Sequence, residues 1–282
     1  MEAASRDRIL VMDGAMGTMI PSPQKDSLNR TSPEWIQSIY RQYLLAGADI
    51  LKTNTFNSNS EPHDFELNVA GARLARAALD EFTAANPPRT RFIAGSMGPG
   101  RDGNAPVEAF HEQARGLIEG GVDMLLVETI TSIHTAHSAL SGIERVFGTI
   151  GRELPVMLSI TISRDGTLIS GESIESFWKA FSNTRIFSVG INCGFGSRNV
   201  RPFIKTLSEM ATTRVSCHPS AGLPDSFGIY DESPEETAGI LSAFAREGLV
   251  DIVGGCCGTT PAHTRAIAEA VRTIPRATID HL

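Results

Sequence analysis

Short apolar, β-prone runs recur at fairly even spacing along the chain. There are eight such runs, at Ile9 to Met12, Asp49 to Leu51, Arg91 to Ala94, Asp123 to Val127, Val156 to Ile162, Ile186 to Ile191, Arg214 to Ser216 and Val250 to Val253. Between them lie amphipathic stretches in which apolar residues follow the helical period. Clear examples are Pro33 to Ala46, Asn68 to Ala85, Val107 to Glu119, Ser173 to Phe181, Val200 to Met210 and Pro234 to Glu247. Strand and helix are therefore expected to alternate along the whole sequence.

This alternation over 282 residues favours an α/β fold of the (β/α)8 TIM barrel type. A doubly wound sheet has a similar periodicity and stays the alternative. Glycines where helices would end, as in Ala46-Gly-Ala-Asp and Gly120-Gly-Val-Asp, suit the loops on the amino-terminal face of a barrel. No linker divides the sequence, so a single domain is expected over residues 1–282, with a tail formed by the last few residues.

The composition narrows the class of protein. A hydrophobic content of 41% with 20% charged residues is typical of a globular chain and argues against disorder. The net charge of −7 comes without any cluster of Lys and Arg, which disfavours nucleic acid as a partner. Met1 to Arg8 is too polar for a signal peptide, and no apolar run approaches the roughly 20 residues of a membrane span. We therefore expect a cytoplasmic protein that does not enter a membrane.

Three of the four cysteines follow predicted strands. Cys193 comes after the sixth strand, and the adjacent pair Cys256 and Cys257 comes after the eighth. In a barrel, residues at the carboxyl ends of different strands meet on one rim, where active sites lie. Three thiolates converging there suggest zinc with an open fourth position. The alternatives are small buried residues or, less favourably, a strained vicinal disulfide. Cys217 is expected to be a structural thiol.

Four segments carry a more specific signal, and they resemble, in order, the motifs of the homocysteine S-methyltransferase family. They are Asp13-Gly-Ala-Met-Gly-Thr, Thr53-Asn-Thr-Phe-Asn, Gly190-Ile-Asn-Cys-Gly and Gly254-Gly-Cys-Cys-Gly-Thr-Thr-Pro. Together they span nearly the whole chain. Within the family, the sequence most resembles the homocysteine-binding module of cobalamin-dependent methionine synthase, because Ala221-Gly-Leu-Pro-Asp-Ser-Phe-Gly-Ile-Tyr is also similar to that branch.

The resemblance implies a (β/α)8 barrel that binds one Zn²⁺ through Cys193, Cys256 and Cys257, with the homocysteine thiol as fourth ligand. It also implies methyl transfer to that thiol, giving methionine. Zinc favours the thiolate, which a free thiol with a pKa near 8.5 forms only in small part at neutral pH. We expect the methyl donor to be methylcobalamin carried by a separate corrinoid protein. S-methylmethionine and betaine are the alternative donors.

The amino acid end of homocysteine needs partners of its own. Asp13 ends the first strand, and the following residues, including Ala15 and Met16, could offer backbone N–H groups to a carboxylate. Glu128 ends the fourth strand and could take the ammonium group. By resemblance, Asp13 and Glu128 match acidic positions near homocysteine in this family. Asn192 is a further candidate substrate contact.

Other candidate residues have simpler explanations. An acid at a strand end, such as Asp13, often caps the next turn. His218 is a candidate zinc ligand on chemical grounds alone, although packing of its ring is the better account. Thr260 and Pro261 have the pattern of a helix start.

Two positions depart from the methionine synthase pattern. Lys52 stands where that branch often has an acid, and Ser220 stands where it often has Asn. Since the resemblance implies that this Asn lies near the exchangeable position of the zinc, Ser220 leaves open how this position is filled before the substrate binds. Two rival functions also stay open. They are a zinc- and thiol-binding subunit without turnover, and an unrelated barrel enzyme with incidental cysteines.

Overall fold

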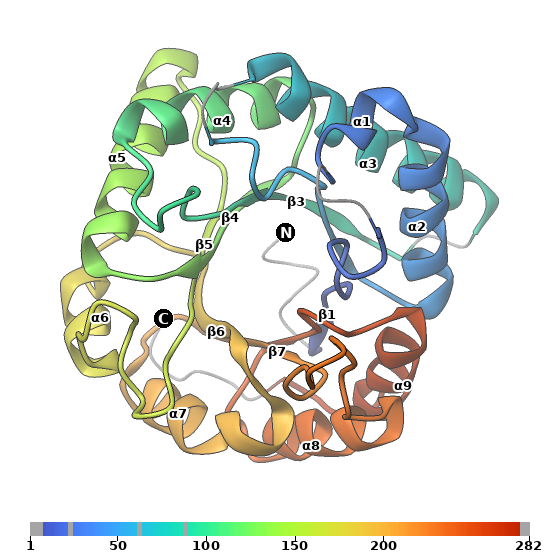
Figure 1. The fold of residues 1–282 in the computed structure, drawn as a ribbon, viewed down its shortest axis with the longest axis vertical. Coiled ribbons are helices and arrows are strands. Elements are labelled where there is room, and N and C mark those ends of the chain that lie inside the picture. The colour runs from blue at the N-terminus through green and yellow to red at the C-terminus, as the bar shows by residue number, and fades with distance from the viewer. Residues whose placement is uncertain (1–7, 22–24, 61–63, 87–88, 277–282) are drawn as a thin grey trace.

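The computed structural model describes residues 8–21, 25–60, 64–86 and 89–276. In this part of the chain, eight parallel strands form one sheet in the order β1-β8-β7-β6-β5-β4-β3-β2, which curves into a ring (Figure 1). A parallel bridge between Met12 and Ile50 joins the first and last strands of that order. The strands are β1 (Leu10–Val11), β2 (Ile50–Lys52), β3 (Phe92–Met97), β4 (Met124–Ile130), β5 (Val156–Ile160), β6 (Ser188–Gly196), β7 (Arg214–Ser220) and β8 (Ile252–Val253).

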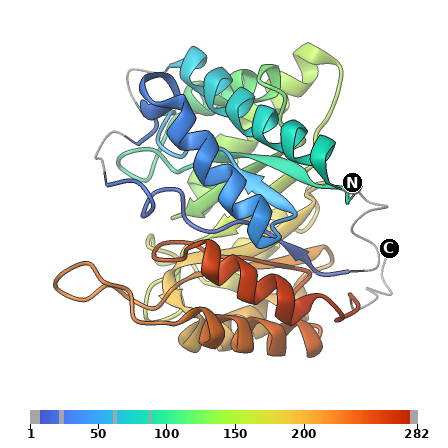
Figure 2. The same cartoon turned by 90° about the vertical axis from the view of Figure 1, so that its right-hand side faces the viewer.

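The helices surround the sheet on its outer side (Figures 1 and 2). They are α1 (Leu28–Thr31), α2 (Pro33–Ala46), α3 (Phe65–Ala85), α4 (Val107–Glu119), α5 (Ile133–Ile150), α6 (Ile174–Phe181), α7 (Ser197–Met210), α8 (Pro234–Arg246) and α9 (Pro261–Val271). This arrangement confirms the expected TIM barrel of a single domain. The expected tail at the last residues lies outside the described residues. No helix in the described ranges is long and apolar enough to cross a membrane.

Buried side chains form two clusters, one on each face of the strands. The smaller cluster, which includes Leu10, Ile50, Phe92 and Leu126, faces the inside of the barrel. The larger cluster packs between the strands and the helices. Because side chains alternate between the two faces of a strand, Lys52 and Glu128 share the inward side with Ile50 and Leu126. Polar residues therefore close the barrel interior at the carboxyl ends of the strands.

Three aspartates close the opposite end of the barrel. Each follows a glycine with positive φ in the loop between a helix and the next strand, and its carboxylate accepts a backbone N–H from the neighbouring strand. The pairs are Asp49 with Val11 (3.0 Å), Asp123 with Ile93 (2.8 Å) and Asp251 with Val215 (2.8 Å). The predicted glycine-containing loops thus hold the strands together on the amino-terminal face, away from the functional rim.

The strands β6 and β7 extend further than their apolar residues indicated. They stay paired through Asn192 with His218 and, after a shift in register, Gly196 with Ser220. Cys193 and His218 therefore lie within strands rather than after them. The polar sequence of this extension lacks the hydrophobic signal that identifies a strand. Thr260 and Pro261 do begin α9, and Thr260 and His263 form its capping box.

Candidate active site

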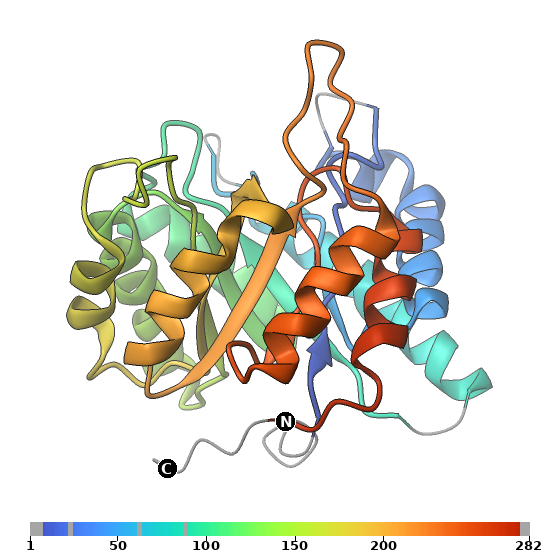
Figure 3. The same cartoon turned by 90° about the horizontal axis from the view of Figure 1, so that it is seen from below.

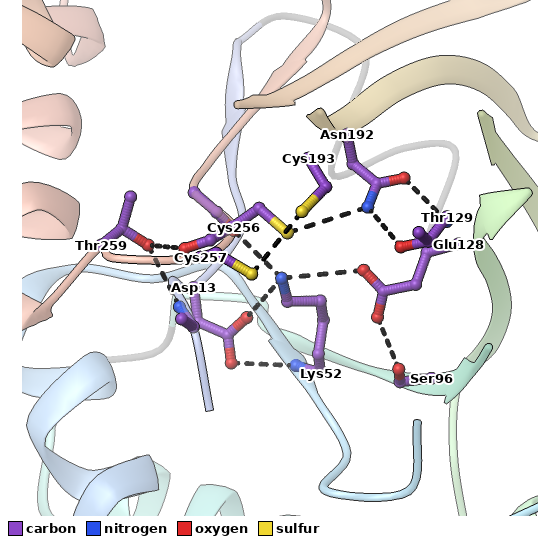
Figure 4. Close-up of polar contacts among 12 residues, drawn as sticks. Asp13, Lys52, Ser96, Glu128, Thr129, Asn192, Cys193, Cys256, Cys257 and Thr259 are labelled. Atoms are coloured by element: carbon purple, nitrogen blue, oxygen red, sulfur yellow. Dashed lines mark hydrogen bonds and ion pairs between the residues drawn. The ribbon is translucent and has the colours of Figure 1, made fainter. Parts of the chain in front are cut away.

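The three predicted metal ligands meet at the carboxyl rim of the barrel. The Sγ atoms of Cys193, Cys256 and Cys257 all lie within 4.8 Å of one another. The Sγ atoms of Cys193 and Cys257 are 3.5 Å apart (Figure 4). We call these three residues the cysteine cluster. Cys217 is buried on the outer side of β7 among core residues, in agreement with a structural thiol.

A bulge in β6 positions the first cysteine. Cys193 has a φ of 56°, and Gly194 follows with a φ of 65°, both within the register shift between Asn192 and Gly196. A left-handed backbone costs a residue with a side chain roughly 1–2 kcal/mol, so the surrounding contacts must hold it in place. A Cβ on Gly194 would lie 2.7 Å from the backbone oxygen of Ile162, which requires glycine at this position.

The loop after β8 is equally constrained. A Cβ on Gly255 would lie 2.3 Å from Oγ1 of Thr259. The N–H of Cys256 donates to the oxygen of Pro219 (2.8 Å), and the N–H of Ala221 donates to the oxygen of Cys257 (2.9 Å). Backbone hydrogen bonds to the β7 end therefore hold the adjacent cysteines against Cys193.

The thiols of the cluster share their protons unequally. Hydrogen bonds from the Cys256 and Cys257 thiols lower the pKa of Cys193, and the bond from Cys256 has the larger effect. The same contacts with Cys193 raise the pKa of Cys256 and the pKa of Cys257. Three thiolates this close repel one another unless a cation lies between them. The donor set of three sulfur atoms therefore fits a soft divalent metal ion.

Each cysteine also contacts one polar side chain outside the cluster. The Ser220 hydroxyl donates to Sγ of Cys193 at 3.6 Å, and Nδ2 of Asn192 lies 3.8 Å from Sγ of Cys256. The Tyr230 hydroxyl is hydrogen-bonded to Cys257, and burial, together with the negative charge of Cys257, raises the pKa of Tyr230. Tyr230 lies in a motif recognised in the sequence, but nothing in the pattern indicated its contact with a thiol.

Asn192 is itself held in a fixed orientation. Its Oδ1 accepts the N–H of Thr129 at 2.9 Å, and its Nδ2 donates to Oγ1 of Thr129 at 2.9 Å. Thr129 has a φ of 60°. Thr129 was not predicted as a site residue, because an unusual backbone conformation at a threonine leaves no trace in the sequence. The amide of Asn192 is thus held against Cys256, while its contact with substrate stays a prediction.

His218 does not join the cysteine cluster. It is fully buried in β7, and neither ring nitrogen has a hydrogen-bond partner within the described residues. Burial, followed by the charge of Lys52, lowers its pKa to about 3. His218 is therefore a neutral, packed side chain.

The two candidate acids lie next to the cluster and face the same lysine (Figure 4). Asp13 is 2% exposed and Glu128 is 5% exposed. The Lys52 ammonium lies 4.0 Å from Oδ1 of Asp13 and 3.9 Å from Oε2 of Glu128. The other oxygen of Asp13 accepts the backbone N–H of Lys52 at 3.0 Å, and the other oxygen of Glu128 accepts the Ser96 hydroxyl at 2.5 Å.

The charges of Asp13 and Lys52 respond differently to this setting. Burial raises the pKa of Asp13 to about 7 against the opposing attraction of Lys52. Burial lowers the pKa of Lys52, but Glu128, Asp13 and the adjacent cysteines together outweigh it and raise the pKa above its usual value. Desolvation prevails at Asp13 because the Lys52 ammonium is 4.0 Å away and is shared with Glu128.

One backbone N–H group in the segment after Asp13 has a partner within the protein. The N–H of Ala15 donates to Oγ1 of Thr259 at 3.1 Å, and the Tyr43 hydroxyl donates to the oxygen of Ala15 at 2.7 Å. Met16 packs partly buried against the core. The Ala15 N–H is therefore already occupied, so a substrate contact of Ala15 would involve another atom, while the predicted contact of Met16 stays a prediction.

The structure thus defines a TIM barrel with a metal-competent thiol cluster and a buried acid pair on its catalytic rim. The model of the homocysteine S-methyltransferase family matches residues 10–271 of the chain. The chain therefore belongs to this family and is an enzyme of it.

Solved structures share the fold. The homocysteine methyltransferase MmuM from Escherichia coli in its apo form is 22% identical, with a TM-score of 0.73, covering 93% of this chain and 96% of that one. The metallated form of MmuM is 20% identical, with a TM-score of 0.72 and coverage of 93% and 96%. KGPDC from Streptococcus mutans is 13% identical, with a TM-score of 0.53 and coverage of 95% and 99%. At these identities the likeness supports the barrel architecture alone.

Proposed function

We propose that this enzyme transfers a methyl group to the thiol of homocysteine, giving methionine, with one Zn²⁺ held by Cys193, Cys256 and Cys257. The observation that carries the proposal is the convergence of the three Sγ atoms within 4.8 Å on the catalytic rim of a chain from this family. When bound, zinc favours the thiolate form of a substrate thiol at neutral pH.

The chain's own residues prepare the site for that metal. Ser220, Asn192 and Tyr230 each direct a polar group at a different cysteine sulfur. Such contacts orient metal ligands and disperse part of their negative charge. The sulfur atoms are thereby held close together at the rim.

The amino acid end of homocysteine is proposed to lie between the cluster and the two acids. In this arrangement Asp13 and Glu128 supply the negative charge of the substrate site. Asn192, Ala15 and Met16 are the neighbouring residues proposed to contact the substrate. The support is geometric, because the Lys52 ammonium lies 4.0 Å from Asp13 and 3.9 Å from Glu128 and also donates to the backbone oxygen of Gly255, which directly precedes Cys256.

The proposed methyl donor is methylcobalamin carried by a separate corrinoid protein. The support is the resemblance of the segment from Ala221 to Tyr230 to the methionine synthase branch, together with the contact of Tyr230 with Cys257. S-methylmethionine and betaine are the competing donors. A reducing cytoplasm is the proposed location, because it keeps clustered thiols available for a metal.

The test is a methyl-transfer assay with zinc-loaded protein and homocysteine, run in parallel with methylcobalamin, S-methylmethionine and betaine. We expect methionine from methylcobalamin, loss of zinc and activity in Cys256→Ala, and retention of both in Cys217→Ala, whose thiol lies outside the cluster. Zinc at one per chain with no methionine from any donor would favour a zinc- and thiol-binding subunit. Unchanged metal content and homocysteine affinity in Cys256→Ala would favour incidental cysteines.

A further inference from the structure

A buried lysine occupies the space between the two acids of the site. The Lys52 side chain is 8% exposed, and its ammonium donates to the backbone oxygen of Gly255 at 3.1 Å. The same ammonium lies about equally far from Asp13 and Glu128, at 4.0 Å and 3.9 Å. Because the Lys52 backbone N–H also donates to Asp13, the residue is fixed at both ends.

This arrangement changes what the acid pair can do for a ligand. Two buried carboxylates without a counter-ion would attract the ammonium group of an amino acid strongly, because a buried charge needs a partner. With Lys52 between them, the two carboxylates already share one positive charge. The three groups keep at most one net negative charge, so the attraction for a second ammonium is reduced and is opposed by Lys52, while the carboxylate of a ligand can pair with Lys52.

The lysine also lies close to the loop that carries two of the three cysteines. The Lys52 ammonium, which lies between the two acids, is also directed toward the loop that carries Cys256 and Cys257 (Figure 4). Gly255, which accepts the hydrogen bond from Lys52, directly precedes this cysteine pair. A ligand whose sulfur lies at the cluster therefore has a resident cation in its neighbourhood.

We propose that Lys52 is a specificity-determining residue whose ammonium takes the place of the substrate's own at the Asp13–Glu128 pair. The site then accepts thiol carboxylates that lack an α-amino group, such as 4-mercaptobutyrate, nearly as well as homocysteine. The carboxylate of such an acceptor is drawn to Lys52, and its sulfur lies at the cysteine cluster. This inference rests on the proposed function, because it concerns the acceptor of the same site.

The experiment compares the affinities of the zinc-loaded protein for homocysteine and 4-mercaptobutyrate by titration calorimetry. We expect the wild-type Kd values to agree within about fivefold. In Lys52→Met the preference for homocysteine should grow by roughly 10- to 100-fold, the range of a charge-assisted contact. Lys52→Arg keeps the charge and should keep the wild-type ratio, as should the surface control Lys205→Met.

The ratio of two affinities in one sample does not depend on how much of a variant is folded. A wild-type preference for homocysteine above about 100-fold would overturn the proposal without any variant, and so would an unchanged ratio in a folded Lys52→Met. Methyl transfer to both thiols is measured in parallel. Failure of transfer with intact binding would contradict the proposed function, while the binding ratio still decides the role of Lys52.

Discussion

At the scale of single residues, each sulfur of the cysteine cluster has a polar neighbour of its own. The pairs are Ser220 with Cys193, Asn192 with Cys256 and Tyr230 with Cys257. A metal site depends on such neighbours almost as much as on its ligands, because they fix the ligand orientation and share its charge. These contacts support the proposal that the cluster is a metal site.

Tyr230 allows this preparation to be tested with a small change. Tyr230→Phe removes the hydroxyl that contacts Cys257 and keeps the ring that packs over Gly258. We expect zinc affinity to fall by roughly 10-fold, as for other residues that support metal ligands. Competition with a chromogenic chelator measures this change. Wild-type affinity in the variant would show that the hydroxyl does not support the site.

Asp13 gives a prediction for the pH dependence of stability. Burial raises its pKa from 3.8 to about 7, so between these values the folded protein holds a proton that the unfolded chain has lost. The contribution of Asp13 to the free energy of unfolding therefore falls as pH rises through this window, by up to about 1.4 kcal/mol per pH unit.

Asp13→Asn cannot ionise and should remove this slope. We expect the variant to gain stability relative to the wild type from pH 4 to pH 7, as measured by urea unfolding at several pH values. Asp80→Asn removes an exposed carboxylate outside the site and serves as the control. A constant difference between wild type and Asp13→Asn across the window would contradict the prediction.

At the scale of elements, the bulge in β6 places Cys193 of this strand in the cysteine cluster. Gly194 has a φ of 65° and no room for a Cβ beside the oxygen of Ile162. Gly194→Ala should therefore lower the free energy of unfolding by about 1–3 kcal/mol and reduce zinc binding, because Cys193 must shift. Unfolding in urea and metal analysis measure the two effects.

A second glycine provides the matched control. Gly239 lies in α8 with nothing within 4 Å of the position a Cβ would take. Gly239→Ala should be neutral or raise the free energy of unfolding by about 0.5–1 kcal/mol, since alanine favours a helix. Equal effects at the two positions would show that the bulge has no special role.

The sequence predicted the regular elements better than the irregular ones. Apolar runs identified eight strands because parallel strands of a barrel are buried on both faces. The extensions of β6 and β7 were not recognised, since Asn192, Cys193 and His218 give no apolar signal. The left-handed backbone at Thr129 and the position of Lys52 between two acids arise only from tertiary packing. The sequence motifs therefore identified the three thiols and both acids as candidate site residues. They did not identify the residues that contact these groups in the fold.

At the scale of the whole molecule, the segment between β7 and α8 stands above the rim (Figure 3). Its side chains Phe227 and Ile229 are 86% and 63% exposed, while Tyr230 at its base reaches Cys257. Oδ1 of Asp225 accepts the N–H groups of Phe227 and Ile229 at 2.8 Å and 2.9 Å, which gives the turn a defined shape. An apolar turn beside the site is suited to contact a methyl donor carried on another protein.

The proposed corrinoid partner makes a last prediction possible. Replacing Phe227 and Ile229 by Ser removes exposed apolar surface without touching the cysteine cluster. We expect the KM for a methyl donor carried on a corrinoid protein to rise about tenfold, because truncating apolar contacts weakens an interface. The KM for free methylcobalamin should stay unchanged. Leu45→Ser, at an exposed site on α2, is the control. If both donors are affected alike, the turn acts on the site itself; if neither is affected, the carrier approaches the rim elsewhere.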